Sequence, residues 1–89
     1  MTSLEIIISG KVQGVGFRYS ALTKAEEFGI HGFARNLPNG DVLIEAESDN
    51  EDSISFFLQW CYEGPALARV INVQSTKTAP KHYKNFTIR

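Results

Sequence analysis

The sequence is poor in the residues that small proteins use for covalent stabilisation or metal binding. Among 89 residues there is one cysteine, Cys61, so no disulfide can close within the chain. The two histidines, His31 and His82, have no carboxylate or cysteine partner at a telling spacing, and no Cys/His group has the spacing of a zinc site. These absences exclude a disulfide scaffold and predict a protein of a reducing, cytoplasmic compartment without a metal centre.

Strong charge and long apolar runs are also lacking. Nine Lys and Arg residues stand against ten Asp and Glu residues, so the net charge is -1 and no global field exists to gather polyanions. We therefore expect no nucleic-acid partner. The apolar run after Glu5 is too short for a signal segment or a membrane span, so we expect no membrane association. Repeats and linkers are missing too, so residues 1–89 are expected to form one domain.

What the sequence does contain is a regular order of secondary-structure signals. Apolar residues that alternate with polar ones are typical of strands, and apolar residues three and four positions apart are typical of helices. Gly29 has the position of a left-handed helix C-cap, and Ser48 with Glu51 forms a capping box that predicts the start of a second helix. The predicted elements are strand 4–10, helix 18–28, strand 30–37, strand 41–47, helix 49–62, strand 68–76 and strand 86–88.

This order predicts an α+β fold in which both helices bury one apolar stripe against the same face of a largely antiparallel sheet. Many unrelated binding and catalytic proteins share this order, so the fold alone does not decide the function. In the third strand we expect Val42, Ile44 and Ala46 to face the core. Glu45 and Glu47 are interpreted as part of a solvated face.

Three lysines make the region before the last predicted strand locally basic: Lys77, Lys81 and Lys84. We interpret them as part of a solvated loop, with electrostatic guidance of an anionic substrate as a weaker hypothesis. Cys61 falls on the apolar stripe of the second helix, where we do not expect a nucleophilic role.

The most informative stretch is the glycine-rich loop of residues 10–18, which joins the first strand to the first helix. Its glycines, Gly10, Gly14 and Gly16, permit backbone conformations in which several N–H groups turn toward one point. Arg18 adds a planar fork of donors suited to phosphate or carboxylate, and the helix that begins there adds partial positive charge. From the residues alone, two interpretations stay open: an anion cradle and a tight turn.

Asn36, at the end of the second strand, is the other candidate for chemistry. It stands beside the hairpin signal Pro38-Asn39-Gly40, so its side chain has an ordinary role available as a cap of that turn. Alternatively, its amide can donate to one oxygen and accept from another, which is what orienting a water molecule requires. The residues alone favour the cap and leave the second role open.

Taken together, these stretches make the chain similar to the acylphosphatase family. The segment from Gly10 to Arg18 matches the family's first motif at every defining position, and the segment from Gly32 to Val42 matches the second. One departure is visible at Ser48, where the second motif commonly ends in glycine, and we expect it to change a helix cap and leave the chemistry intact. The resemblance covers essentially the whole chain, with weaker agreements at Gly64-Pro65, at Ala68 with Val70, and at Phe86 with Ile88.

The resemblance implies a ferredoxin-like βαββαβ sandwich with a short extra C-terminal strand, and an enzyme that hydrolyses small acyl phosphates to carboxylate and inorganic phosphate. It implies a reaction without metal, cofactor or covalent intermediate, and we expect the protein to act as a monomer. In the family, the motif arginine, here Arg18, binds the phosphate, and the motif asparagine, here Asn36, positions the attacking water. The phosphate-binding residues that it implies are Val12, Gln13, Gly14, Val15, Gly16, Phe17 and Arg18.

Elementary chemistry explains how so few residues would suffice. A carboxylate leaving group has a conjugate acid with a pKa of about 4, so it can depart without a general acid. Phosphoryl transfer then requires mainly positioning and charge stabilisation from the protein, and a phosphate oxygen of the substrate is a candidate base. Two other functions stay open: a non-catalytic module that binds phosphate or carbamoyl phosphate, and RNA binding, which the acidic, aromatic-free third strand disfavours.

Overall fold

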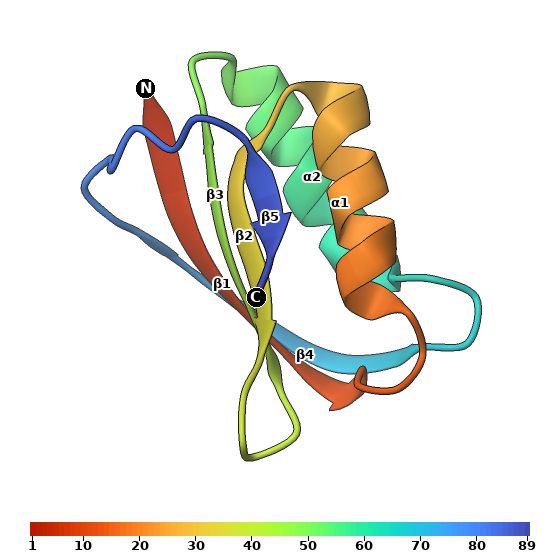
Figure 1. Ribbon diagram of the computed structural model, residues 1–89. Helices are drawn as coiled ribbons and strands as arrows, with labels where there is room; N and C mark the ends of the chain where they lie inside the picture. Colours follow the sequence, from red (N-terminus) through yellow and green to blue (C-terminus); the bar gives the residue numbers. More distant parts are fainter.

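The computed structural model describes the whole chain, residues 1–89. All the predicted elements are present, and no boundary differs from its predicted position by more than two residues. In chain order the elements are β1 (Thr2–Lys11), α1 (Phe17–Phe28), β2 (His31–Asn36), β3 (Val42–Ser48), α2 (Glu51–Glu63), β4 (Arg69–Lys77) and β5 (Phe86–Ile88) (Figure 1).

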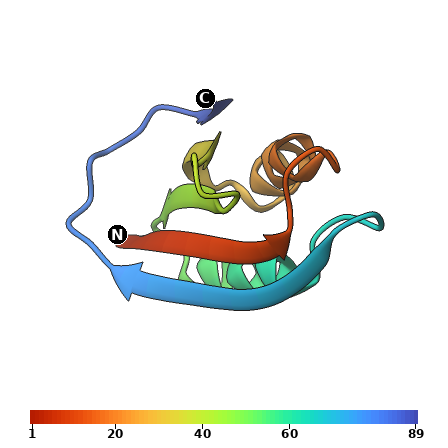
Figure 2. The ribbon, with the colours of Figure 1, turned by 90° about the horizontal axis from the view of Figure 1, so that it is seen from below.

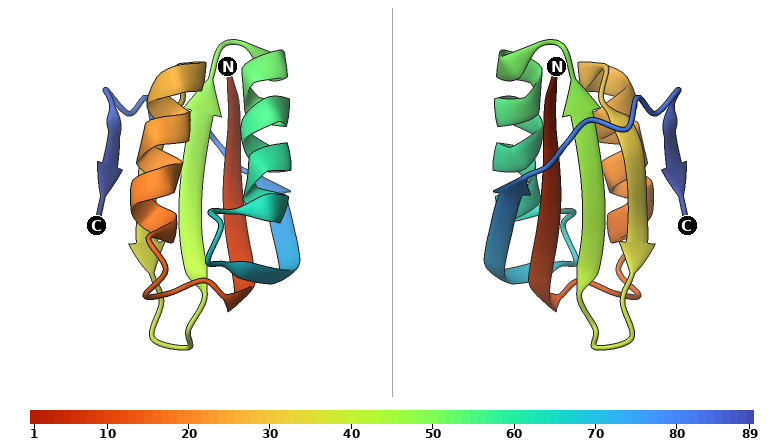
Figure 3. Two further views of the ribbon diagram at one scale, coloured as in Figure 1. Left: turned by 90° about the vertical axis from the view of Figure 1, so that its right-hand side faces the viewer. Right: turned by 90° about the vertical axis from the view of Figure 1, so that its left-hand side faces the viewer.

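The strands form one five-stranded sheet in the order β4-β1-β3-β2-β5. The pairs β1–β3, β1–β4 and β2–β3 are antiparallel, and Figure 2 shows β1 and β4 side by side along their length. The short β5 pairs in parallel with β2, so the sheet is mixed. Both helices cover one face of this sheet and leave the other face open (Figure 3). This arrangement confirms the ferredoxin-like prediction. No helix has the length and apolar character needed to cross a membrane.

The core lies between the helices and the covered face of the two central strands. Ile6 of β1 and Ile44 of β3 are register partners, and both are fully buried. Val42 and Ala46 are buried beside them, which confirms the predicted inward face of β3. The helices complete the core with Ala21, Ala25, Ile54, Phe57 and Cys61.

Capping signals in the sequence predicted one helix end correctly and one wrongly. Gly29 adopts the left-handed conformation with φ 70° after α1, as predicted. The prediction of Ser48 as N-cap of α2 is wrong, because Ser48 still pairs with Thr2 in the β1–β3 ladder. Asn50 is the N-cap instead, and its Oδ1 accepts from the N–H groups of Asp52 (2.9 Å) and Ser53 (3.1 Å).

The open face of the sheet is partly covered by the segment between β4 and β5, residues 78–85, which we call the strap. Figure 3 shows it crossing the sheet on the side without helices. Glu47 lies beneath the strap with 1% of its surface exposed. Its carboxylate accepts from the main-chain N–H groups of Lys81 (2.6 Å) and Tyr83 (2.8 Å) and from the Ser3 hydroxyl (3.3 Å). The interpretation of Glu47 as solvated is therefore wrong.

Glu45 holds the same strap through side chains. Its Oε1 accepts from the Tyr83 hydroxyl at 2.6 Å and from Lys81 Nζ at 2.7 Å. Because Lys81 is paired in this way, it is part of the strap's attachment to β3 rather than a free cation of a solvated loop. The strap in turn brings the chain to β5 and to the open edge of β2.

The pKa of Glu47 reflects this attachment. Burial alone raises the pKa of a carboxyl group, but the donors from Lys81, Tyr83 and Ser3 lower it below its ordinary value of 4.5. A carboxyl group whose pKa is lowered by folding stabilises the folded state while it is ionised. The contribution is complete above the ordinary pKa and is lost as the pH falls through the lower, folded-state pKa.

We predict that Glu47→Gln lowers the free energy of unfolding at pH 7 by about 1–3 kcal/mol, because the amide can satisfy fewer donors than the carboxylate. Urea unfolding between pH 3 and pH 7 measures this. The wild-type protein should lose stability below about pH 4.5, and the variant should lose less over that range. Glu26→Gln, on the exposed surface of α1, is the matched control. Identical pH profiles for wild type and Glu47→Gln would contradict the prediction.

Candidate active site

The loop between β1 and α1, residues 12–16, is anchored in the core at both sides. Val12 and Phe17 are buried, with 1% and 2% of their surfaces exposed. Between them, Gly14 and Gly16 have φ values of 73° and 77°, which side chains rarely adopt. The loop is therefore held by its two ends, while its glycines give the backbone its curvature.

The anchor at Phe17 is shared with α2. The Phe17 ring packs against Trp60 with 5.3 Å between ring centroids. On another side it approaches Gly64, where an added Cβ would stand only 2.6 Å from Phe17 Cε2. Gly64 therefore has a packing role as well as ending α2, and the first turn of α1, which carries Arg18, is fixed by this contact.

The main-chain N–H groups of the loop have no acceptor within the protein. From Gln13 through Arg18, none of them donates to a main-chain or side-chain oxygen, and no side chain caps α1. Helix N-termini and loops with such free donors are suited to binding anions. The loop thus has donors available where the sequence predicts an anion cradle.

Gln13 ties this loop to the β2–β3 hairpin. Its Nε2 donates to the carbonyl oxygens of Leu37 and Asp41, both at 2.8 Å. These two residues also bond to each other through Leu37 N–H and Asp41 O at 2.8 Å. Figure 1 shows the loop and the hairpin turn at the same end of the molecule. The Gln13 side chain consequently fixes the loop relative to the end of β2.

Asn36 is the last residue of β2, beside that hairpin. The turn itself is capped by Asn39, whose Oδ1 accepts from the N–H of Asp41 at 3.0 Å. The Asn36 amide makes no hydrogen bond within the protein, although the residue is only half-exposed. Asn39 caps the turn, so the interpretation of Asn36 as its cap is wrong.

The Arg18 side chain is held by the residue that follows β5. Its Nη1 donates to the main-chain oxygen of Arg89 at 2.9 Å, and Arg89 is held by a hydrogen bond from its N–H to Ala34 O at 2.9 Å. The Arg89 guanidinium lies over the Phe33 ring, 4.0 Å from its centroid. Arg18 forms no ion pair with an Asp or Glu side chain.

A small cavity brings these parts together. It has a volume of about 90 Å³, and both Arg18 and Asn36 line it. Of the predicted phosphate-binding residues, Gln13 and Val15 do not line it. Tyr19 does, and the sequence interpretation missed it, although its position directly after Arg18 in the first helical turn was an available signal. The lining residues are Val12, Gly14, Gly16, Phe17, Arg18, Tyr19 and Asn36.

The size of this cavity restricts what it can hold. Sites for drug-sized molecules have volumes of roughly 300–1,000 Å³, so 90 Å³ suits a group of the size of phosphate. The Arg18 guanidinium and the free N–H groups give the cavity a positive character. An amide that can donate and accept lies at its wall. The arrangement can hold an anion and orient one small neutral molecule beside it.

The other residues that the sequence analysis considered do not line this cavity. Cys61 is fully buried, and burial raises the pKa of its thiol, which fits its predicted place in the core. His31 is an exposed residue of β2 whose Nδ1 lies 3.0 Å from Tyr83 O. Lys77 pairs with Leu4 near the start of β1, at the opposite end of that strand from the loop. None of Lys77, Lys81 and Lys84 lines the cavity.

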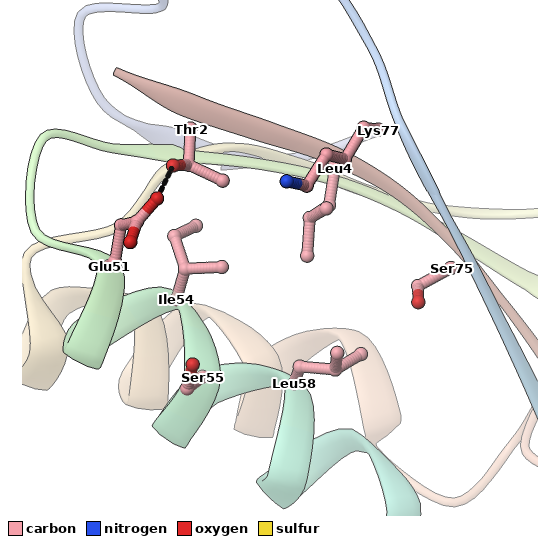
Figure 4. Close-up of a pocket in the computed structure, with 8 residues that line it drawn as sticks. All are labelled: Thr2, Leu4, Glu51, Ile54, Ser55, Leu58, Ser75 and Lys77. Atoms are coloured by element: carbon pink, nitrogen blue, oxygen red, sulfur yellow. Dashed lines mark hydrogen bonds between the residues drawn. The ribbon is translucent and has the colours of Figure 1, made fainter.

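The largest cavity of the molecule is also separate from these residues. It has a volume of about 480 Å³ and lies between α2 and the edge of the sheet formed by β1 and β4 (Figure 4). The Thr2 hydroxyl donates to Glu51 Oε1 across its rim at 3.2 Å. It contains none of the predicted site residues, so size alone does not identify the site in this molecule. Its lining residues are Thr2, Leu4, Glu51, Ile54, Ser55, Leu58, Ser75 and Lys77.

The fold and the cavity define the class of protein: a ferredoxin-like α/β sandwich with an anion-suited cavity at its first strand-to-helix loop. The family model described as Acylphosphatase matches residues 4–88. An acylphosphatase of Thermotoga maritima is 42% identical over 89 residues, which cover 100% of this chain and 98% of that protein. This chain belongs to the acylphosphatase family.

Solved structures agree with this assignment. The structure of an acylphosphatase from Coxiella burnetii matches with a TM-score of 0.94 and 41% identity, over 99% of this chain and 92% of that one. The crystal structure of acylphosphatase from Bacillus subtilis matches with a TM-score of 0.96 and 30% identity, over 100% and 99% of the two chains.

We predict that Gln13→Ala weakens phosphate binding at least about threefold and lowers the free energy of unfolding by about 1–2 kcal/mol, because both hydrogen bonds to the hairpin are lost. Titration with inorganic phosphate, followed by NMR, and urea unfolding measure the two effects. Gln59→Ala, on the exposed face of α2, is the matched control. Phosphate affinity equal to that of wild type would show that the loop keeps its shape without the Gln13 bonds.

Proposed function

We propose that this protein hydrolyses the carboxyl–phosphate bond of small acyl phosphates, giving a carboxylate and inorganic phosphate without a metal ion. The observation that carries the proposal is the cavity of about 90 Å³, which is lined by Arg18, by Asn36 and by loop residues whose main-chain N–H groups are free. Membership of the acylphosphatase family supports the same reaction. The site belongs to a protein that we propose to be a cytoplasmic monomer.

In the proposed reaction, the phosphoryl group occupies the cavity. Its oxygens accept from the main-chain N–H groups of the loop and from the guanidinium of Arg18. These donors are fixed before the substrate arrives, because the loop is anchored by Val12 and Phe17 and tied by Gln13. Donors that need no reorganisation stabilise the negative charge that develops on the phosphoryl oxygens in the transition state.

Asn36 positions the attacking water. Its amide has no partner within the protein, so it can accept a hydrogen bond from the water and donate another to a phosphoryl oxygen. The water attacks phosphorus as the bond to the carboxylate oxygen breaks. The carboxylate leaves unprotonated because its conjugate acid has a pKa of about 4, and a phosphate oxygen of the substrate takes the proton of the water.

A non-catalytic phosphate or carbamoyl-phosphate module is the alternative on the same fold. The comparisons do not favour it, because the matches to proteins named as acylphosphatases extend over nearly the whole length of both partners. Hydrolysis of benzoyl phosphate by the purified protein in the presence of EDTA separates the possibilities. Binding without turnover would favour the module, and activity abolished by the chelator would contradict the metal-independent route.

We predict that Arg18→Ala lowers kcat/KM for benzoyl phosphate by about 100-fold or more and also weakens inhibition by inorganic phosphate. The reason is that one pre-aligned charged donor to the phosphoryl group is removed. Steady-state kinetics measure both quantities. Arg35→Ala is the matched control, since Arg35 is an exposed arginine of β2 that does not line the cavity. Unchanged activity in Arg18→Ala would refute the mechanism.

We predict a different pattern for Asn36→Ala. Its kcat should fall by about 100-fold, while inhibition by inorganic phosphate stays close to that of wild type, because the variant loses the ligand of the water and keeps those of the phosphate. Asn72→Ala, at an exposed position of β4, serves as the control. If Asn36→Ala lost phosphate binding and Arg18→Ala kept it, the two assigned roles would be exchanged.

A further inference from the structure

The size of the cavity leaves part of an acyl phosphate outside it. A volume of about 90 Å³ accommodates the phosphoryl group, so the acyl group must emerge at the rim. Val12 and Phe17 are buried in the wall, and Gly14 and Gly16 have no side chain to offer. In the proposed function Arg18 and Asn36 are engaged with the phosphate and the water. Among the residues that line the cavity, one side chain is then left for the acyl group, that of Tyr19.

Tyr19 has the properties of a contact residue rather than of a packing residue. It lies in the first turn of α1 with 74% of its surface exposed. Its ring pairs with no other aromatic ring, and its hydroxyl makes no hydrogen bond. The fold therefore makes little use of this large side chain. Tyr19 is one of the residues that line the cavity, and it follows Arg18 directly in the chain.

We propose that Tyr19 determines specificity by contacting the acyl group of the substrate, and that it favours acyl phosphates whose acyl group is flat and apolar. The acyl carbon is joined to the phosphorus through a single oxygen, so a substrate held in the cavity has its acyl group at the rim. A phenol ring offers a flat apolar surface there, and stacking of two aromatic groups is favourable beyond the area that they bury. This inference rests on the proposed function.

The test compares benzoyl phosphate with acetyl phosphate, whose acyl group is too small to stack. In Tyr19→Ala we expect the ratio of the two kcat/KM values, benzoyl over acetyl, to fall about threefold to tenfold, mainly through KM for benzoyl phosphate. Inorganic phosphate, which fills only the cavity, should inhibit the variant with a constant within about twofold of wild type. Tyr19→Phe, which keeps the ring, should restore the wild-type ratio.

Tyr62→Ala is the matched control, because Tyr62 is a similarly exposed tyrosine on α2 that does not line the cavity. An unchanged benzoyl-to-acetyl ratio in Tyr19→Ala, or an equal loss for both substrates, would overturn the role of Tyr19 and leave the proposed function standing. If the wild-type protein hydrolysed neither substrate, the proposed function itself would fail, and the specificity with it.

Discussion

The burial of Val12 and Phe17 is the constraint on which the rest of the site depends. Both residues belong to the core, so the chain between them must bridge a short fixed span. The glycines allow the tight curvature, and the anchors remove the freedom that glycines would otherwise give. The Phe17 ring packs against Trp60 and lies close to Gly64, so packing against the end of α2 sets the position of the first turn of α1.

The loop and Asn36, two of the three groups of the site, lie at the ends of strands that are not neighbours in the sheet. In the sheet, β3 lies between β1, which leads into the loop, and β2, which ends at Asn36. Gln13 reaches across this separation to carbonyl oxygens on both arms of the hairpin. The third group, Arg18, is held by its hydrogen bond to the main-chain oxygen of Arg89, which follows β5. Each group therefore has its own attachment, and the cavity is the place where the three meet.

Much of this organisation could be predicted from the sequence, because it depends on local signals. Periodicity together with turn and capping signals identified every helix and strand, and Gly29 marked the end of α1 correctly. The errors concern residues whose role is set by distant contacts. Ser48 had the sequence of an N-cap, but pairing with Thr2 keeps it in β3. The sequence pattern places Glu47 on the polar face of its strand. Only the strap, more than thirty residues later in the chain, buries its carboxylate and donates hydrogen bonds to it.

The same distinction applies to the candidate site. The motifs identified Arg18 and Asn36, and the structure brings both into one cavity. The side-chain role of Gln13 was not predictable, since its acceptors are main-chain carbonyls that any residue can provide. Tyr19 was missed because an exposed aromatic residue carries no periodic signal, and its one available signal was its position directly after Arg18. What the sequence leaves undetermined here is which surfaces meet, and that depends on the assembled sheet.

The strand order has a consequence for how the molecule folds. Among neighbouring strands only β2 and β3 are joined by a short turn, whereas every other pair requires the closure of a longer stretch of chain. Loop closure costs entropy before the contacts form, so such a topology folds more slowly than a helical bundle of similar size. The hairpin of β2 and β3 can form early, but Asn36 is the only one of the three site groups that it contains. The ability to hold an anion therefore requires β1 and β5 to join the sheet and α1 to pack on it.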